Sequence, residues 1–155
     1  MIDRPEVVQT STQLVASIHL TIPRSQIQEV MGRGLQEVFA TVAAQGLTPT
    51  GPWLTHHYGM TPESFDFEIC LPVPTPVTAS GRVLPGELGA MRVARTVYRG
   101  GFEGLGDAWG ELDAWVAATG LVAAPDLIER YLAGPESSDN PADWRTELIR
   151  PLLAG

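Results

Sequence analysis

One acid of the chain, Glu147, lies within residues 144–151 ("WRTELIRP"), where side-chain types alternate as they do in a β-strand. Alternation places Glu147 on one strand face with Ile149, and Trp144 and Thr146 on the other face. The plain interpretation is a solvated residue on the wet face of an antiparallel sheet. A glutamate beside aromatic rings would instead suit a lipophilic cation, and burial would raise its pKa toward the range of a general acid or base.

Aromatic residues and one histidine could line such a site. Trp109 lies on the apolar stripe of a predicted helix, and Trp144 opens the strand that carries Glu147. His57 belongs to "HHY", which we align with "ERY", the segment that ends at Tyr131 in the second half of the chain. Most tryptophans pack in protein cores, and packing is the alternative for each of these residues. We expect His57 and Tyr131 to line the site.

A metal site is not expected. Neighbouring histidines in a strand face opposite ways, so His56 and His57 cannot both bind one metal ion. His19 is the only other histidine, and Cys70 lies in an apolar run ("FDFEICLPV") that is typical of a buried structural thiol. No glycine-flanked serine indicates a Ser-His-Asp centre, and "RGGFEGLG" lacks the GK[ST] of a phosphate-binding loop. We therefore expect neither a metal nor another cofactor.

Charge limits the class of partner. The 155 residues carry a formal net charge of −8, from 18 acidic and 10 basic side chains. This balance opposes binding to a phosphate backbone and favours a neutral or cationic partner. The sequence shows no export signal and no run of about 18 apolar residues. We expect a cytoplasmic protein that binds a small lipophilic molecule, does not span a membrane and does not bind nucleic acid directly.

The chain contains an internal duplication. Three segments of the first half return in the same order in the second half: "VAAQGL" (42–47) as "VAATGL" (116–121), "PES" (62–64) as "PES" (135–137), and "FEICLPV" (67–73) as "TELIRPL" (146–152). The offset grows from 73 to 79 between the last two matches, which predicts a six-residue insertion before the final strand. The duplication also aligns Glu68 with Glu147.

Each copy has the pattern strand, helix, strand, strand. Residues 14–22 are mostly β-branched or apolar, and residues 26–44 carry apolar side chains at the three-and-four spacing of one helix face. Gly46 suits the end of that helix. Residues 53–60 and 65–73 predict two further strands, the second with its phenylalanines on one face.

The second copy predicts the same elements, and the residues between the copies, rich in proline and glycine, predict a connector without regular structure. We therefore expect an α+β fold with tandem strand-helix-strand-strand modules, an antiparallel sheet with two helices, a pseudo-two-fold axis and a cleft between the repeats. The expected boundaries are a single domain over residues 1–155, repeat one at about 7–73, the connector at about 74–88 and repeat two at about 89–153.

The segments "YRGGFEGLGDAWGELDAWV" and "ERYLAGPE…WRTELIRPL" resemble the GyrI-like small-molecule-binding family, which is related to the effector-binding domains of the regulators BmrR and Rob. The resemblance covers nearly the whole chain and implies the tandem fold. It also implies an acidic residue of the last strand in an aromatic-lined cleft that takes lipophilic, often cationic compounds, and Glu147 matches that position. Trp109 and Phe102 match positions that are often aromatic in such proteins.

The resemblance leaves three functions open. The first is a stand-alone small-molecule binding protein, and the ligand-binding residues expected for it are Glu147, Trp109, Phe102, His57, Tyr131 and Trp144. The second is a hydrolase of strained cyclopropane- or epoxide-containing small molecules, with Glu147 as general base. The third is a protein-binding inhibitor of the gyrase-inhibitor type. No segment reads as a helix-turn-helix, so we expect a binding protein first, rather than an enzyme or a DNA-binding repressor.

Overall fold

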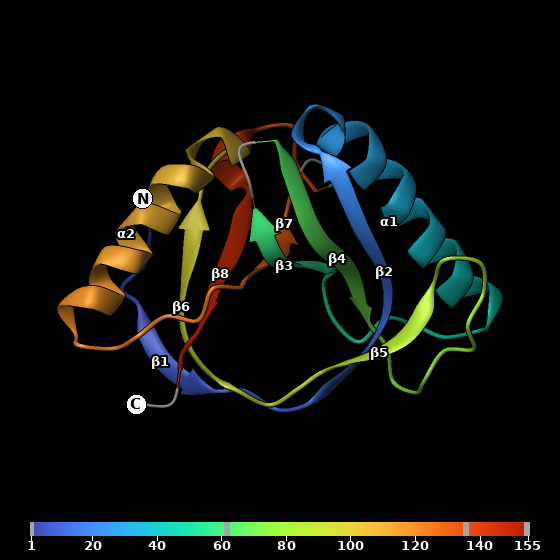
Figure 1. Ribbon diagram of the computed structural model, residues 1–155. Coiled ribbons are helices and arrows are strands. Elements are labelled where there is room, and N and C mark those ends of the chain that lie inside the picture. Colours follow the sequence, from blue (N-terminus) through green and yellow to red (C-terminus); the bar gives the residue numbers. More distant parts are fainter. Residues whose placement is uncertain (1, 61–62, 135–136, 154–155) are drawn as a thin grey trace. The chain divides into compact units, whose positions relative to one another are not determined.

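The described part of the chain divides into two compact units, each with one α-helix and four strands (Figure 1). The structure, a computed structural model, describes residues 2–60, 63–134 and 137–153. The first unit is Ser11–Ala90, and the second unit combines Met1–Thr10 with Met91–Gly155. The predicted α+β class and the tandem modules with two helices and antiparallel strands are confirmed.

In the first unit, the strands follow the antiparallel order β3-β4-β2-β5. The elements are β2 (Gln13–Pro23), α1 (Ile27–Ala44), β3 (Leu54–Met60), β4 (Ser64–Pro72) and β5 (Leu84–Leu88). Phe67 and Ile69 of β4 are fully buried in one core with Val38 and Val42 of α1. The three-and-four spacing of the helix and the alternation of the strand thus predicted correctly which faces meet.

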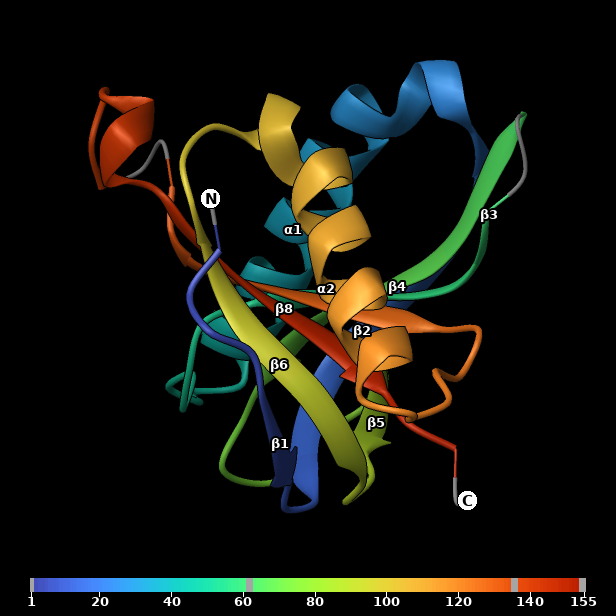
Figure 2. The same cartoon turned by 90° about the vertical axis from the view of Figure 1, so that its left-hand side faces the viewer.

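In the second unit, the antiparallel order is β1-β6-β8-β7. The elements are β1 (Glu6–Gln9), β6 (Arg92–Arg99), α2 (Leu105–Ala118), β7 (Leu127–Ala133) and β8 (Arg145–Pro151). Tyr98 of β6 and Leu148 of β8 share a core with Leu112 and Val116 of α2. Figure 2 shows β1 running alongside β6, with α2 in front of the strands.

The helix ends confirm the duplication. Gly46 has φ 71° and Gly120 has φ 79°, the left-handed conformation that glycine adopts without steric cost. The N–H of Gly46 donates to the carbonyl of Ala43 at 3.0 Å, and the N–H of Gly120 donates to that of Ala117 at 3.1 Å. The two repeated segments therefore close their helices in the same way.

Strand register corrects the alignment that the sequence predicted. Each unit has a β-bulge in the strand that follows its helix, after His57 in β3 and after Tyr131 in β7. His57 therefore corresponds to Tyr131 at an offset of 74, while Phe67, opposite His57, corresponds to Thr146 at an offset of 79. The insertion is thus five residues rather than six. The repeated "PES" falls partly on residues 61–62 and 135–136, outside the described residues.

The prediction of a connector without regular structure is wrong for residues 84–88. These residues form β5, which pairs with β2 and belongs to the first unit. The short strand β1 pairs with β6 and belongs to the second unit. Each module therefore gains an outer strand from a segment outside its own strand-helix-strand-strand run. Proline-rich sequence hid β5, since Pro85 lies on an edge strand, where the missing N–H is tolerated.

Two smaller findings bear on the expected class of protein. Cys70 is buried, and burial together with the nearby charge of Glu68 raises the pKa of its thiol, in agreement with a structural cysteine. Within the described residues, no helix is both long and apolar enough to cross a membrane.

Candidate ligand-binding site

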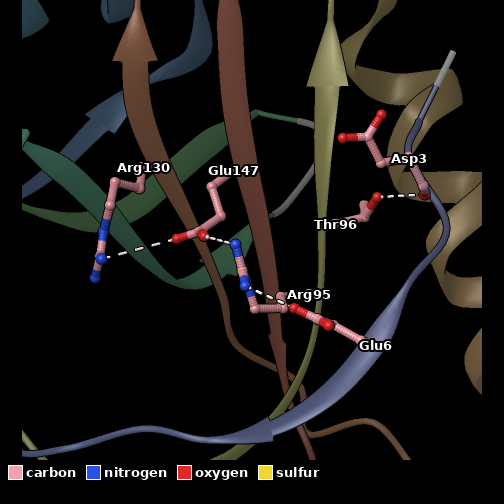
Figure 3. Close-up of polar contacts among 6 residues, drawn as sticks. All are labelled: Asp3, Glu6, Arg95, Thr96, Arg130 and Glu147. Atoms are coloured by element: carbon pink, nitrogen blue, oxygen red, sulfur yellow. Dashed lines mark hydrogen bonds and ion pairs between the residues drawn. The ribbon is translucent and has the colours of Figure 1, made fainter.

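Glu147 lies between two arginines (Figure 3). The Arg95 guanidinium donates to Glu147 Oε2 at 2.6 Å, and the Arg130 Nη1 atom lies 3.8 Å from Oε1. Arg95 also donates to Glu6 Oε1 at 2.7 Å. The Glu147 side chain is only 10% exposed, and two fixed positive charges neutralise it. The carboxylate of Glu147 therefore already has its counter-ions within the protein.

The aromatic residues predicted to accompany Glu147 lie on the other face of the sheet. Leu148, the next residue of β8, packs against α2, so alternation turns Glu147 away from that helix. Trp109, by contrast, belongs to the same core as Leu148. Glu147 and Trp109 therefore lie on opposite faces of the sheet.

Glu129 of β7 is the acid that contacts the predicted aromatic residues. The Trp109 indole N–H donates to Glu129 Oε2 at 2.8 Å, and the Tyr131 hydroxyl donates to Glu129 Oε1 at 2.7 Å. Leu127, two residues before Glu129, packs in the α2 core, as expected for the same strand face. Both carboxylate oxygens are thus oriented by neutral donors.

Two further rings extend this group. Phe102, in the 3-10 turn Phe102–Gly104 that precedes α2, lies 5.0 Å from Trp144 and 6.1 Å from Tyr131 between ring centroids. The Trp144 indole N–H donates to the carbonyl of Ser138 at 2.9 Å, which fixes the ring at the start of β8. The structure thus brings together four of the six predicted site residues, which are Phe102, Trp109, Tyr131 and Trp144. We call these four residues with Glu129 the Glu129 cluster.

The charge of Glu129 has no cationic partner in the part of the chain that the structure describes. Arg150 does approach the cluster, because its guanidinium lies over the Trp109 ring at 5.0 Å from the centroid. That guanidinium is paired with Asp113 at 3.1 Å and also donates to the carbonyl of Asp126 at 2.9 Å. Arg150 therefore holds the tryptophan in place while its own charge is met by another acid.

Thr146 lies in the same cross-strand row of the sheet as Tyr131 of the Glu129 cluster. It stands opposite Tyr98 of β6 and Tyr131 of β7, and it is fully buried. The equivalent row of the first unit is Leu20, Phe67 and His57. In this row the second unit therefore has a threonine between two tyrosines, where the first unit has a phenylalanine between a leucine and a histidine.

His57, the remaining predicted site residue, lies in the first unit. Its ring stacks on Phe67 at 5.2 Å, and its Nε2 atom is 3.0 Å from Thr55 Oγ1. Its contribution to a ligand site stays a prediction. Across residues 2–60, 63–134 and 137–153, no three histidine, cysteine, aspartate or glutamate side chains are grouped so as to hold a metal ion.

Comparison with known proteins identifies the family. The model of the GyrI-like small molecule binding domain matches residues 4–153. The chain belongs to this family. The resemblance inferred from "YRGGFEGLGDAWGELDAWV" and the C-terminal motif is therefore confirmed. A comparison with curated proteins finds no match.

Solved structures with GyrI-like architecture share the fold at low identity. The C-terminal domain of EcmrR is 21% identical, with a TM-score of 0.86 and coverage of 98% of both chains. EcmrR in complex with DNA has a TM-score of 0.84 at 21% identity, with 98% of this chain and 58% of that chain covered, so this chain spans little more than half of the EcmrR chain. A hydrolase from Listeria innocua has a TM-score of 0.74 at 15% identity, with 97% and 92% covered. SAV2435 bound to tetraphenylphosphonium has a TM-score of 0.64 at 12% identity, with 98% and 95% covered.

Sequence reasoning missed Glu129, although a signal was present. Residues Leu127, Glu129 and Tyr131 alternate on one face of a strand, and the first and last are the kind of residue that packs against a helix. A carboxylate between them breaks the apolar pattern of that face. The one-residue error in aligning "HHY" with "ERY" placed Glu129 opposite His56 instead of Thr55, and thus concealed that it faces α2.

Proposed function

We propose that this chain binds a lipophilic organic cation at the Glu129 cluster, with Glu129 as the charge partner. The observation that carries the proposal is the state of the Glu129 carboxylate. Two neutral donors orient it, and among the described residues no arginine or histidine forms an ion pair with it. A partly buried carboxylate without a counter-ion is stabilised most by a weakly hydrated cation, because such a cation loses little hydration free energy when it binds.

The surrounding rings suit the rest of such a ligand. Phe102 is 39% exposed and contacts both Tyr131 and Trp144, so an apolar molecule near Glu129 would meet ring faces and edges. Aromatic faces attract cations with delocalised charge, and the effect grows when water is excluded. The net charge of −8 adds a general attraction for cations.

One structure of the same fold is consistent with this ligand class. SAV2435, which shares the fold, is described as bound to tetraphenylphosphonium, a lipophilic cation. The family model is that of a small molecule binding domain. We take tetraphenylphosphonium as the first probe for this chain on these grounds, together with the geometry of the Glu129 cluster.

Charge preference is the test of the proposal. Tetraphenylphosphonium should quench the tryptophan fluorescence saturably and bind at least about tenfold more tightly than neutral triphenylphosphine oxide, which corresponds to about 1.4 kcal/mol. The Glu129→Gln variant should lose that preference while keeping the far-ultraviolet spectrum of the folded chain. Equal binding of the cation and the neutral compound by the wild-type protein would contradict the proposal.

A second candidate function is hydrolysis, favoured by the contact between Tyr131 and Glu129 at 2.7 Å. In this scheme Glu129 removes a proton from a water molecule while the water oxygen attacks a carbon of the epoxide ring. The bond between that carbon and the epoxide oxygen breaks, and Tyr131 protonates the epoxide oxygen. The net change is addition of one water molecule to the ring. A relative of the same fold is described as a hydrolase.

Turnover separates the two candidate functions. A hydrolase should convert a lipophilic aryl epoxide to its diol, and Tyr131→Phe should lower kcat by about 100-fold with little change in KM, as expected for loss of a general acid. A binding protein should give no diol above the rate without protein. Saturable binding of that epoxide without turnover would exclude the hydrolase for this substrate class.

A further inference from the structure

The hydroxyl of Thr146 is buried and lacks a hydrogen-bond partner in the described part of the second unit. The residue is 0% exposed, and its hydroxyl oxygen is one of few buried side-chain atoms in this condition. Buried polar groups are nearly always hydrogen-bonded, because a buried group without a partner has lost its hydrogen bonds to water and gained none in return, which destabilises the folded protein. An isosteric valine would avoid that cost, so the threonine needs an explanation.

The neighbouring hydroxyl groups do not supply the missing bond. Thr146 stands directly between Tyr98 and Tyr131 in the sheet. The Tyr98 hydroxyl donates to the carbonyl of Gly101 at 2.7 Å, and the Tyr131 hydroxyl donates to Glu129. Both phenolic protons are thus directed elsewhere, although cross-strand neighbours in a sheet are close enough to interact.

The first unit shows that the fold does not need a hydroxyl at this position. Phe67 occupies the equivalent place between Leu20 and His57, and it is fully buried in the α1 core. A large apolar side chain therefore fills the position well in one copy. The second copy has a smaller side chain with a hydroxyl there, on the same face as Glu129.

Thr146 also lies next to the rings that would surround a ligand. Trp144, two residues earlier in the chain, shares its side of β8, and Phe102 contacts both Trp144 and Tyr131. The Phe102 ring is 39% exposed, whereas the backbone beside it is tied down through Gly101. Phe102, an exposed side chain, is the part of this group of rings that can most readily change its rotamer when a molecule binds.

We infer that Thr146 is a specificity-determining residue of the Glu129 cluster, reserved for a polar atom of the ligand. The preferred ligand class is then a lipophilic cation that also carries a hydroxyl or carbonyl group, rather than a purely hydrocarbon cation. The inference rests on the proposed function, because it assigns a second contact to the same ligand. A site that hydrogen-bonds a ligand hydroxyl rejects the analogue that lacks the hydroxyl more strongly than an apolar pocket rejects an analogue that lacks a methylene group.

Four probes that differ by a single hydroxyl test this inference. They are tetraphenylphosphonium and the 2-, 3- and 4-hydroxyphenyl derivatives of triphenylphosphonium. At least one hydroxyphenyl probe should bind the wild-type protein about fivefold or more tightly than tetraphenylphosphonium. In Thr146→Val this preference should disappear, and Thr146→Ser should retain it.

Several results would overturn the inference. No preference among the four probes in the wild-type protein would do so and would leave the proposed function standing, provided that tetraphenylphosphonium binds through Glu129. A preference that persists in Thr146→Val would also overturn it. Failure of all four probes to bind would remove both the inference and the function on which it rests.

A second measurement needs no ligand. If the hydroxyl is unpaired in the free protein, Thr146→Val should raise the Tm by roughly two degrees or more, because a costly polar group is removed without a change of shape. Thr146→Ser should lower the Tm, because it keeps the hydroxyl and loses a methyl group. A lower Tm for Thr146→Val would show that the hydroxyl has a partner in the free protein, and the inference would fail.

Discussion

Glu129 and Glu147 are both partly or largely buried acids of the second unit, and they differ in what neutralises them. Glu147 contacts two guanidinium groups, whereas Glu129 contacts an indole N–H and a phenol. A carboxylate already paired with arginine is costly to unpair and has little to offer a cation. The Glu129 carboxylate is held by neutral donors and has no protein cation paired with it among the described residues, which is why we propose Glu129 as the charge partner of the ligand. The role of each glutamate therefore follows from its neighbours.

The structural role of Glu147 leads to a stability prediction. Glu147→Gln should lower the free energy of unfolding by about 1–3 kcal/mol, because Arg95 and Arg130 would lose a shared partner at a site with little access to water. Urea denaturation measures this change. Glu6→Gln is the matched control, since Glu6 pairs with the same Arg95 but its side chain is 58% exposed.

The control should lose less than about 1 kcal/mol, as is usual for an exposed ion pair. Equal losses in the two variants would show that burial does not distinguish the two contacts of Arg95.

Asp66 gives the pH dependence that the structure supports. A hydrogen bond with His19 lowers the pKa of Asp66 below its ordinary value of 3.8, and partial burial opposes this shift. A lowered pKa in the folded state stabilises the protein above pH 3.8, and this stabilisation is lost as the pH falls through the folded-state pKa. The pair is exposed, so the effect should be only a few tenths of a kcal/mol.

Urea midpoints of the wild-type protein and Asp66→Asn should therefore differ at about pH 5 and converge toward about pH 2. A gap that widens on acidification would contradict the stated direction of the shift.

At the scale of elements, the turn before α2 places Phe102. The Tyr98 hydroxyl donates to the carbonyl of Gly101 and passes close to Gly104, where an added Cβ would lie 2.1 Å from that hydroxyl oxygen. Tyr98 is 6% exposed, so its ring has little room to move. The absence of a side chain at Gly104 is thus a condition for the hydrogen bond that ties the turn to β6.

Gly104→Ala should destabilise the chain by about 1–3 kcal/mol, because either the ring or the turn must shift and the bond to Gly101 is lost. Gly106→Ala is the control, as nothing lies within 4 Å of an added Cβ at this position of α2. Alanine is the better helix former, so the control should be neutral or more stable by up to about 1 kcal/mol. Thermal unfolding of both variants decides, and equal effects would contradict this account of the turn.

Local periodicity predicted the elements well, and register was its weak point. The helix stripe through Val38 and Val42 and the alternation through Phe67 and Ile69 were correct, because both patterns are set by one buried face. A β-bulge cannot be seen in such a pattern, because it adds one residue without changing composition. The bulge after Tyr131 and its counterpart after His57 were therefore visible only in the structure.

The candidate site was predicted in part for a related reason. Trp109, Tyr131, Phe102 and Trp144 were chosen for residue type and family resemblance, and the structure groups them. Alternation already placed Glu147 on the strand face opposite Trp144, but strand alternation alone does not tell which face meets the helix. Packing of Leu148 against α2 settles that question.

At the scale of the whole molecule, the chain passes between its units twice, because β1 precedes the first unit and belongs to the second. The two crossings fall after Thr10 and before Met91, and the Thr10 N–H donates a hydrogen bond to the Met91 carbonyl at 2.8 Å. The second unit therefore depends on both ends of the chain, while the first is one continuous segment.

Removal of residues 1–10 should act mainly on the second unit. Strand β6 would become an edge strand and lose the bond from Asp3 N–H to the Val97 carbonyl. Amide hydrogen exchange should become at least about tenfold faster in β6, with much smaller changes in β2 and β4. Equal acceleration in all strands would show instead that the chain opens as one cooperative body.

We propose that the ligand's charge is met at Glu129 and not at Glu147. Calorimetric titration of tetraphenylphosphonium into Glu129→Gln and Glu147→Gln, each confirmed as folded at the temperature of measurement, compares the two acids directly. The Kd should rise at least about tenfold in Glu129→Gln, a loss of about 1.4 kcal/mol, and should stay within about twofold of the wild-type value in Glu147→Gln. The reverse order of these two effects would contradict the proposal.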